Sequence, residues 1–290
     1  MTSTIPYSAQ KDDLFFPVRR GDFFASGLPR SDSGLCAEMS RLVYARKEPE
    51  FGFDKEVIAR VVANIGFENC LFFESDNASE QDGTHCFVAT RSGPSPSERI
   101  AVVAFRGTDA QDPRDLEDDA EFLLKPWGRT KGNVNAGFLS GLLDVLPALE
   151  PQIALLNGRV LYTGHSLGAA MATLLVSVRA PSALYTYGSP RVGDADFVAT
   201  LRGVDNHRYV DCADVVTRVP PEGFDYQHFG DPYYIGFDRM VRFNPGDLFM
   251  QRDRLAASLN YTVKYSWRWG DNWLRSLADH APINYVWALE

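Results

Sequence analysis

One stretch, residues 158–172, constrains the fold of this 290-residue chain more than any other. It begins with a short apolar run that predicts a β-strand, continues with Gly-His-Ser-Leu-Gly, and ends in small residues that predict the start of a helix. A G-x-S-x-G pattern between a strand and a helix is typical of a nucleophile elbow, a sharp turn that presents a serine. Gly164 and Gly168 leave the space that such a turn needs, and Ala169 lets the helix pack closely under the strand. We therefore predict that Ser166 is a nucleophile.

Apolar runs with strand character alternate with helical patterns along the chain. Residues 100–105 are continuously apolar, as expected for a strand buried on both faces. This alternation predicts an α/β fold with a mostly parallel central sheet flanked by helices. The other predicted strands are residues 69–74, 84–90, 183–187 and 207–211, and the predicted helices are residues 34–44, 54–65 (with Asp54 as N-cap), 137–156 (with Pro147 and Pro151 expected to break or end it) and 194–201.

Length and composition favour a single domain. A chain of 290 residues with 45% hydrophobic residues can bury a large core, and it contains neither an internal repeat nor a low-complexity linker. We therefore expect one domain over residues 1–290, with the aromatic-rich residues 1–30 as an N-terminal extension.

Charge and cysteine spacing exclude several kinds of partner and site. The formal net charge of -9 argues against a nucleic-acid partner, because phosphate binding needs clustered Lys and Arg. The same charge disfavours electrostatic adsorption to anionic lipid. The cysteines lie far apart, with no C-x-x-C pair, so no metal site is predicted, and buried free thiols are preferred over two disulfides. The four are Cys36, Cys70, Cys86 and Cys212.

The termini and apolar runs bear on localisation. The first residues have no basic region followed by an apolar run, so no signal peptide is visible. We find no stretch of about 20 apolar residues, and therefore predict no transmembrane segment. These observations leave three possibilities: a cytoplasmic protein, export by a signal-independent route, or removal of an upstream segment. The sequence leaves the oligomeric state open.

A serine nucleophile needs a base, since its hydroxyl is barely ionised at neutral pH. In folds with this elbow the acid and then the histidine follow the serine in the chain. This order excludes the histidines at positions 85 and 165. His207 begins a predicted strand and is interpreted as structural, which leaves His228 and His280 as alternatives.

The acid and the oxyanion donors come from loops that follow predicted strands. Asp214 lies just beyond a strand end, where ligand-facing residues of open α/β sheets are found. Asp211 competes with it, but a strand-terminal position favours a structural role. The backbone N–H of Leu167 is one expected oxyanion donor, and the Gly107–Thr108 junction suits the second.

Five sequence blocks, in this order, resemble the class 3 lipases, the family of filamentous-fungal triacylglycerol lipases with bacterial and plant relatives. The resemblance covers roughly residues 35–290, and its blocks are VVAFRGT at 102–108, GHSLGAA at 164–170, YGSPRVG at 187–193, DVVTRVPP at 214–221, and DH at 279–280 with Tyr285.

The resemblance implies an α/β-hydrolase-type fold and hydrolysis of carboxylic esters without a metal or organic cofactor. Carried over to this chain, it makes Ser166 the nucleophile, Asp214 the acid and His280 the base. It also implies an oxyanion hole formed by Thr108 and Leu167, and a structural role for the histidine at position 228. The chain departs from the family at Asn135, where a histidine is frequent, so the hydrogen bonding there cannot be transferred.

The activity that follows is that of a triacylglycerol lipase acting on fatty-acyl esters or at a lipid–water interface. Alternatives with the same triad are a phospholipase A1 and a short-chain or aromatic-acid esterase; acyl transfer to an alcohol and a non-catalytic module are further hypotheses. Two segments are candidates for controlling access. Residues 109–134 have apolar side chains at helical spacing (Leu116, Ala120, Leu123, Leu124 and Trp127) and an acidic opposite face, and residues 240–279 are rich in aromatic side chains.

Overall fold

An eight-stranded sheet runs through the part of the chain that the structure describes, with strand order β1-β2-β3-β6-β7-β8-β9-β10. The structure is a computed structural model that describes residues 5–47, 52–76, 83–93, 95, 98–107, 122–221 and 223–289. Strands β3, β6, β7, β8 and β9 pair in parallel, and β1, β2 and β10 add antiparallel edges. The strands are β1 (Asn69–Glu74), β2 (His85–Arg91), β3 (Ile100–Phe105), β6 (Arg159–His165), β7 (Ala183–Tyr187), β8 (Asn206–Asp211), β9 (Pro232–Ile235) and β10 (Val241–Phe243).

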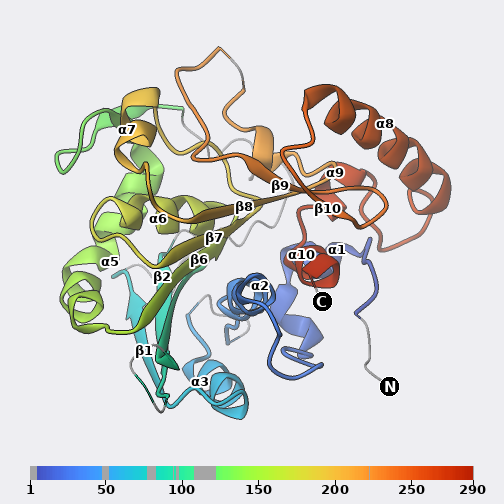
Figure 1. Cartoon of the computed structure of the whole chain (residues 1–290). Coiled ribbons are helices and arrows are strands. Elements are labelled where there is room, and N and C mark those ends of the chain that lie inside the picture. Colours follow the sequence, from blue (N-terminus) through green and yellow to red (C-terminus); the bar gives the residue numbers. More distant parts are fainter. Residues whose placement is uncertain are drawn as a thin grey trace.

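Helices cover both faces of this sheet (Figure 1). One face carries α2 (Asp32–Leu42), α3 (Lys55–Asn64) and α10 (Pro282–Leu289), and the other carries α5 (Ala136–Leu155), α6 (Leu167–Val176) and α7 (Ala195–Thr200). The mostly parallel sheet flanked by helices is the α/β-hydrolase-type architecture expected from the sequence. The remaining elements are α1 (Lys11–Phe15), α8 (Asp247–Lys264), α9 (Arg275–Ala278), the 3-10 helices η1 (Pro17–Arg20) and η3 (Val216–Arg218), and the hairpin of β4 (Leu124–Pro126) with β5 (Asn133–Asn135).

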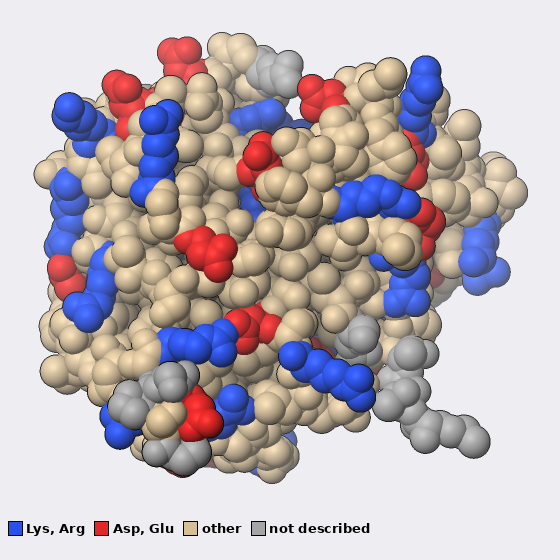
Figure 2. Space-filling model, in the orientation of Figure 1, with Lys and Arg blue, Asp and Glu red and all other residues tan. Residues whose placement is uncertain are grey.

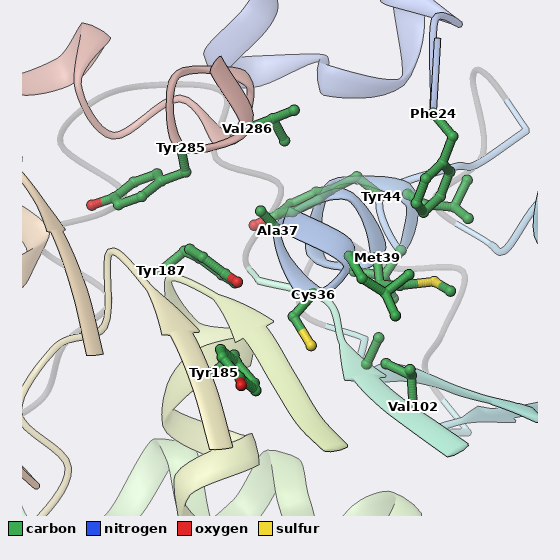
Figure 3. Packing of buried hydrophobic residues seen from close by; sticks show 14 of the residues in the cluster. Phe24, Cys36, Ala37, Met39, Tyr44, Val102, Tyr185, Tyr187, Tyr285 and Val286 are labelled. Atoms are coloured by element: carbon green, nitrogen blue, oxygen red, sulfur yellow. The ribbon is translucent and has the colours of Figure 1, made fainter. Parts of the chain in front are cut away.

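Side chains of the central strands alternate between two apolar cores. In β3, Val102 points into the core under α2, and Val103 points into the core under α5 and α6. Both are completely buried, because a strand sends successive side chains to opposite faces and helices cover each one. Figure 3 shows the first of these cores, where Met39 of α2 and Tyr285 of α10 lie over the sheet.

Helix α5 corrects one sequence prediction. It runs unbroken from Ala136 to Leu155 through Pro147 and Pro151, which were expected to break or end it. Both prolines lie on the exposed side of the helix, where water can bond the carbonyls that lose their helical N–H partners. The buried side, which includes Leu142 and Leu149, packs in the core, so packing outweighs the proline penalty.

By length and composition, α5 is also the one helix among the described residues that could cross a membrane. The sequence expectation of no membrane span did not anticipate it. In the structure Val145, Leu146 and Ile153 of this helix are buried in the core together with residues of α6. That is the environment of a helix that packs within a folded domain.

The N-terminal segment is attached to the C-terminal one. The Ser8 N–H donates to Asn284 Oδ1 at 2.8 Å, and Asn284 Nδ2 donates back to the Ser8 carbonyl at 2.7 Å. The Tyr7 hydroxyl donates to Asp279 Oδ1 at 2.8 Å. Residues far apart in sequence thereby brace the segment that carries His280.

Two further sequence predictions, on residues 109–134 and on the cysteines, can be compared with the described residues. Residues 108–121, which include Leu116 and Ala120, lie outside the described residues. Within the described part of residues 109–134, the helical spacing does not correspond to a helix, because Leu124 begins strand β4. Trp127, beyond Pro126, is buried with its indole N–H donating to Ser177 Oγ. The cysteines are free as predicted, three of them buried and Cys70 partly exposed.

Candidate active site

The turn between β6 and α6 has the geometry of the predicted elbow. Ser166 occupies it with φ 58° and ψ -128°, a backbone conformation that non-glycine residues rarely adopt. A Cβ added at Gly164 would overlap the backbone of Gly168, and one added at Gly168 would overlap the Phe105 carbonyl. Glycine is therefore required at both positions for the turn to pass between two strands and the helix.

Three predicted residues meet at the carboxyl ends of the parallel strands. His280, between α9 and α10, places Nε2 at 3.0 Å from Ser166 Oγ. Asp214, in the loop after β8, lies at 2.9 and 3.0 Å from His280 Nδ1 through its two oxygens. All three side chains are buried. With Nδ1–H donating to the carboxylate, the Nε2 lone pair faces the serine hydroxyl, which is the tautomer that a general base needs.

Several donors hold the Asp214 carboxylate. The Val216 N–H donates to Oδ1 at 2.9 Å, and the Tyr285 hydroxyl donates to Oδ2 at 2.5 Å. Burial and the nearby carboxylate raise the pKa of Tyr285 well above its usual range, so this hydroxyl keeps its proton. The carboxylate is thereby oriented toward His280.

Gly188 packs directly against this pair from the end of β7. Its φ of +61° lies in the left-handed region, and a Cβ added there would stand 2.8 Å from Asp214 Oδ2 and 2.9 Å from His280 Nδ1. The close approach of the backbone, which only glycine permits, limits how the imidazole and the carboxylate can move.

His165 contributes to the site in a way that the sequence reasoning missed. Its Nε2–H donates to the backbone carbonyl of His280 at 2.7 Å, and its Nδ1 accepts from the Tyr44 hydroxyl at 2.8 Å. Burial and then His280 lower the pKa of His165 well below its usual value, so it is neutral. Chain order excluded it as a base, but its position beside the nucleophile already indicated that it lies within the site.

The competing candidates lie elsewhere. His228 donates through Nε2 to the Thr217 carbonyl at 2.8 Å, whereas His280 contacts Ser166. Asp211 accepts from the Cys212 N–H at 2.6 Å, and burial, followed by the Asp279 charge, raises its pKa well above the usual range. Asp279 itself is bonded to Arg275 Nε at 2.9 Å.

The predicted oxyanion donors are placed in part. Leu167 is the first residue of α6, so its N–H has no acceptor within the helix and lies at the positive end of the helix dipole. Thr108 lies outside the described residues. Gly107 packs against the elbow, where an added Cβ would stand 3.2 Å from the Ser166 Cβ. Among the residues that the structure describes, no group of three or more His, Cys, Asp or Glu could hold a metal ion.

The family model described as lipase (class 3) matches residues 102–224, which include β3, the elbow and the Asp214 loop. This match, together with the relatives below, supports the class 3 lipase family for this chain. The match to the family model ends before His280, which the folding of the chain brings next to Ser166.

Curated proteins that are similar to this chain are also named as lipases. The chain is 30% identical over 192 residues to a secreted mono- and diacylglycerol lipase 1 of Fusarium solani, a match that covers 59% of this chain and 56% of that protein. It is 33% identical over 153 residues to a lipase of Rhizopus oryzae, covering 47% of this chain and 38% of the relative. The chain thus spans about half or less of the length of these curated relatives.

Solved structures of lipases share the fold. A lipase from Rhizopus microsporus var. chinensis matches with a TM-score of 0.52 and 26% identity, over 81% of each chain. A Rhizomucor miehei triacylglyceride lipase matches with a TM-score of 0.53 and 25% identity, over 70% of this chain and 77% of that one.

The departure from the family at Asn135 has a local explanation. Its Oδ1 accepts from the Gly137 N–H at 2.9 Å and the Phe138 N–H at 3.1 Å, so Asn135 is the N-cap of α5. Its Nδ2 donates to the Tyr226 hydroxyl at 3.1 Å. An asparagine therefore starts the helix and ties it to the loop before β9.

Proposed function

We propose that the protein is a serine ester hydrolase that cleaves fatty-acyl esters of glycerol. The observation that carries this proposal is the hydrogen-bonded series from Ser166 through His280 to Asp214 at the carboxyl end of the sheet. Similarity to the class 3 lipase family supports it. So do the names of the relatives, which refer to mono-, di- and triacylglycerol lipases.

In the proposed reaction, Ser166 Oγ attacks the ester carbonyl carbon while His280 Nε2 accepts the hydroxyl proton. Asp214 holds the imidazole in its productive tautomer and stabilises the imidazolium that forms. The imidazolium then donates the proton to the leaving alcohol oxygen, and an acyl-enzyme remains on the serine. A water molecule, deprotonated by the same histidine, attacks the acyl-enzyme and releases the fatty acid.

The tetrahedral oxyanion needs donors that are aimed at it before the reaction begins. We propose the Leu167 N–H for one, because it is free of helical bonding and lies at the helix N-terminus. Each such donor contributes about 2.7–4 kcal/mol to lowering the barrier. We propose Thr108 for the second donor, from the resemblance to the family.

Purified protein should be assayed on emulsified monoolein, diolein and triolein, on phosphatidylcholine, and on p-nitrophenyl esters of increasing chain length. We expect hydrolysis of the acylglycerols and labelling by a fluorophosphonate probe. Ser166→Ala should abolish both, while Ser182→Ala, an exposed serine after α6, should retain both. Activity or labelling that survives in Ser166→Ala would contradict the proposal. Faster release of fatty acid from phosphatidylcholine than from any acylglycerol would identify a phospholipase instead.

A further inference from the structure

The outer side of α8 is apolar although it faces solvent. Leu248, Leu255, Leu259 and Val263 are 62%, 64%, 63% and 81% exposed, and their spacing aligns them on one side of the helix. The opposite side is buried through Ala257 and Tyr261. The helix is therefore apolar on two sides, and only the side with Ala257 and Tyr261 is buried.

The loop between α8 and α9 extends this apolar surface. Its three indole side chains, Trp267, Trp269 and Trp273, are 84%, 104% and 71% exposed. Tryptophan is highly buried on average in folded proteins, and contiguous exposed apolar surface marks interaction sites. We refer to these three residues and the four of α8 as the α8 surface. The sequence hypothesis that this segment packs on the outer sheet or caps a pocket does not account for them.

Basic side chains accompany the α8 surface. Residues 238–275 contain seven Lys and Arg against four Asp. Arg275 is buried and bonded to Asp279, so the other charges of this segment sum to +2 in a chain of -9. Lys264 and Arg268 are exposed on either side of the loop start, and Lys11 Nζ lies 4.9 Å from the Trp273 ring centre. Figure 2 shows Lys and Arg, with some Asp and Glu between them, among uncharged surface along the edge that carries α8 in Figure 1.

We propose that the α8 surface docks on an anionic lipid bilayer. An amphipathic helix with basic residues beside an apolar face lies in the plane of a lipid–water interface and buries that face among the acyl chains. Indole rings favour the headgroup level of a bilayer, and Lys and Arg favour its anionic lipids. Because salt screens charges beyond about 10 Å, the basic side chains beside the α8 surface govern the contact more than the net negative charge of the whole chain.

Docking at this surface would hold the catalytic segment close to lipid. Trp273 lies two residues before α9, and His280 follows that helix. Arg275 at the start of α9 is bonded to Asp279, the neighbour of His280, so this short helix connects the tryptophan loop to the catalytic segment. The proposal concerns adsorption and goes beyond ester cleavage, so it is tested without turnover.

The test measures co-sedimentation of the Ser166→Ala protein, which leaves lipid intact, with vesicles of phosphatidylcholine alone and of phosphatidylcholine mixed with phosphatidylglycerol. We expect tighter binding to the mixed vesicles. Trp267→Ser/Trp269→Ser/Trp273→Ser should weaken it at least about tenfold, since each buried indole contributes strongly. Lys264→Ala/Arg268→Ala should weaken it about thirtyfold on mixed vesicles, about fivefold per charge. Leu155→Ser, equally exposed at 74% but at the far end of α5, is the matched control and should bind unchanged.

The proposal is overturned if the parent does not bind, or if the tryptophan variant binds as the parent does while its thermal unfolding midpoint is unchanged. It is also overturned if the parent forms a dimer that the tryptophan variant does not form, since a second copy would then cover the surface. If the wild-type protein did not hydrolyse esters, the proposed function would be contradicted, but the binding results would still stand.

Discussion

Tyr285 donates its hydroxyl proton to Asp214 Oδ2 across 2.5 Å, and its oxygen accepts the Asp211 N–H at 3.1 Å. The ring thus links the end of β8 to the carboxylate that faces His280. Tyr285→Phe removes one donor from a buried charged group, a loss of about 1.5–3 kcal/mol. We expect kcat on a soluble ester to fall about tenfold with KM unchanged, because the imidazolium forms only after substrate binds.

Tyr187→Phe is the matched control for that variant. Tyr187 is equally buried and lies beside the Tyr285 ring, but its hydroxyl donates to the Ser33 carbonyl and not to the Asp214 carboxylate. It should lower the thermal unfolding midpoint and leave kcat near the wild-type value. Equal losses of kcat in the two variants would show that Tyr285 acts through stability alone.

Gly188→Ala should damage the site more than the fold. The positive φ costs roughly 1–2 kcal/mol for any side chain, and the new Cβ would also press on His280 and Asp214. Displacing catalytic groups by about 1 Å can cost on the order of a hundredfold in rate, so we expect kcat to fall by that order. Gly203→Ala, at φ +93° with open space around its Cβ, should show the stability loss with unchanged kcat. Similar kinetics in both variants would contradict the steric role.

Stability should fall as the solution becomes acidic. Burial lowers the pKa of His165 and of His228 well below their ordinary value. Each therefore takes up a proton on unfolding, so the stability present above about pH 6.5 is lost as the pH drops below it. Each contributes a slope of up to about 1.4 kcal/mol per pH unit.

His228→Gln removes one of these two titrating groups, so its contribution to the pH dependence can be measured. The glutamine amide can still donate to the Thr217 carbonyl that His228 contacts, and it does not titrate. Urea unfolding of the variant and parent over a series of pH values should show a shallower acid slope in the variant. The comparison is made between the two proteins, because burial raises the pKa of Asp211 and gives that group the opposite sign. Identical slopes would rule out the contribution of His228.

Pro147→Ala should stabilise the protein. Pro147 lies on the exposed side of α5, where alanine loses no packing and restores the helical N–H donor to the carbonyl four residues earlier. We expect the free energy of unfolding to rise by about 1–3 kcal/mol, with ester hydrolysis unchanged. A lower unfolding midpoint would show that the proline shapes the helix for its packing.

Most secondary structure could be predicted because its signals are local. The strands at 69–74 and 100–105 coincide with the observed β1 and β3, and Asp54 caps α3 through the Val57 N–H. Predictions failed where tertiary packing outweighed local preference. Core burial kept α5 intact through two prolines, and strand pairing with β5 made residues 124–126 extended rather than helical.

The elbow is the part of the site that the sequence determined by itself. The steric demand of a serine between a strand and a helix is met by residues within two positions of Ser166, so the pattern is visible in five letters. The choice of histidine and acid was a matter of tertiary structure. His280 lies 114 residues beyond the serine, and residue patterns alone left His228 as its equal until resemblance to a family favoured one.

Only the folded chain shows which groups share one hydrogen-bonded series and which side chains remain uncovered. Parallel strand pairing brings the ends of β6, β7 and β8 together, and α10 packs over them, so residues from four separate segments meet within hydrogen-bond distance. The same packing leaves three tryptophans of the α8 surface in solvent. The sequence shows where the tryptophans are in the chain, whereas their exposure depends on contacts between residues that are distant in sequence.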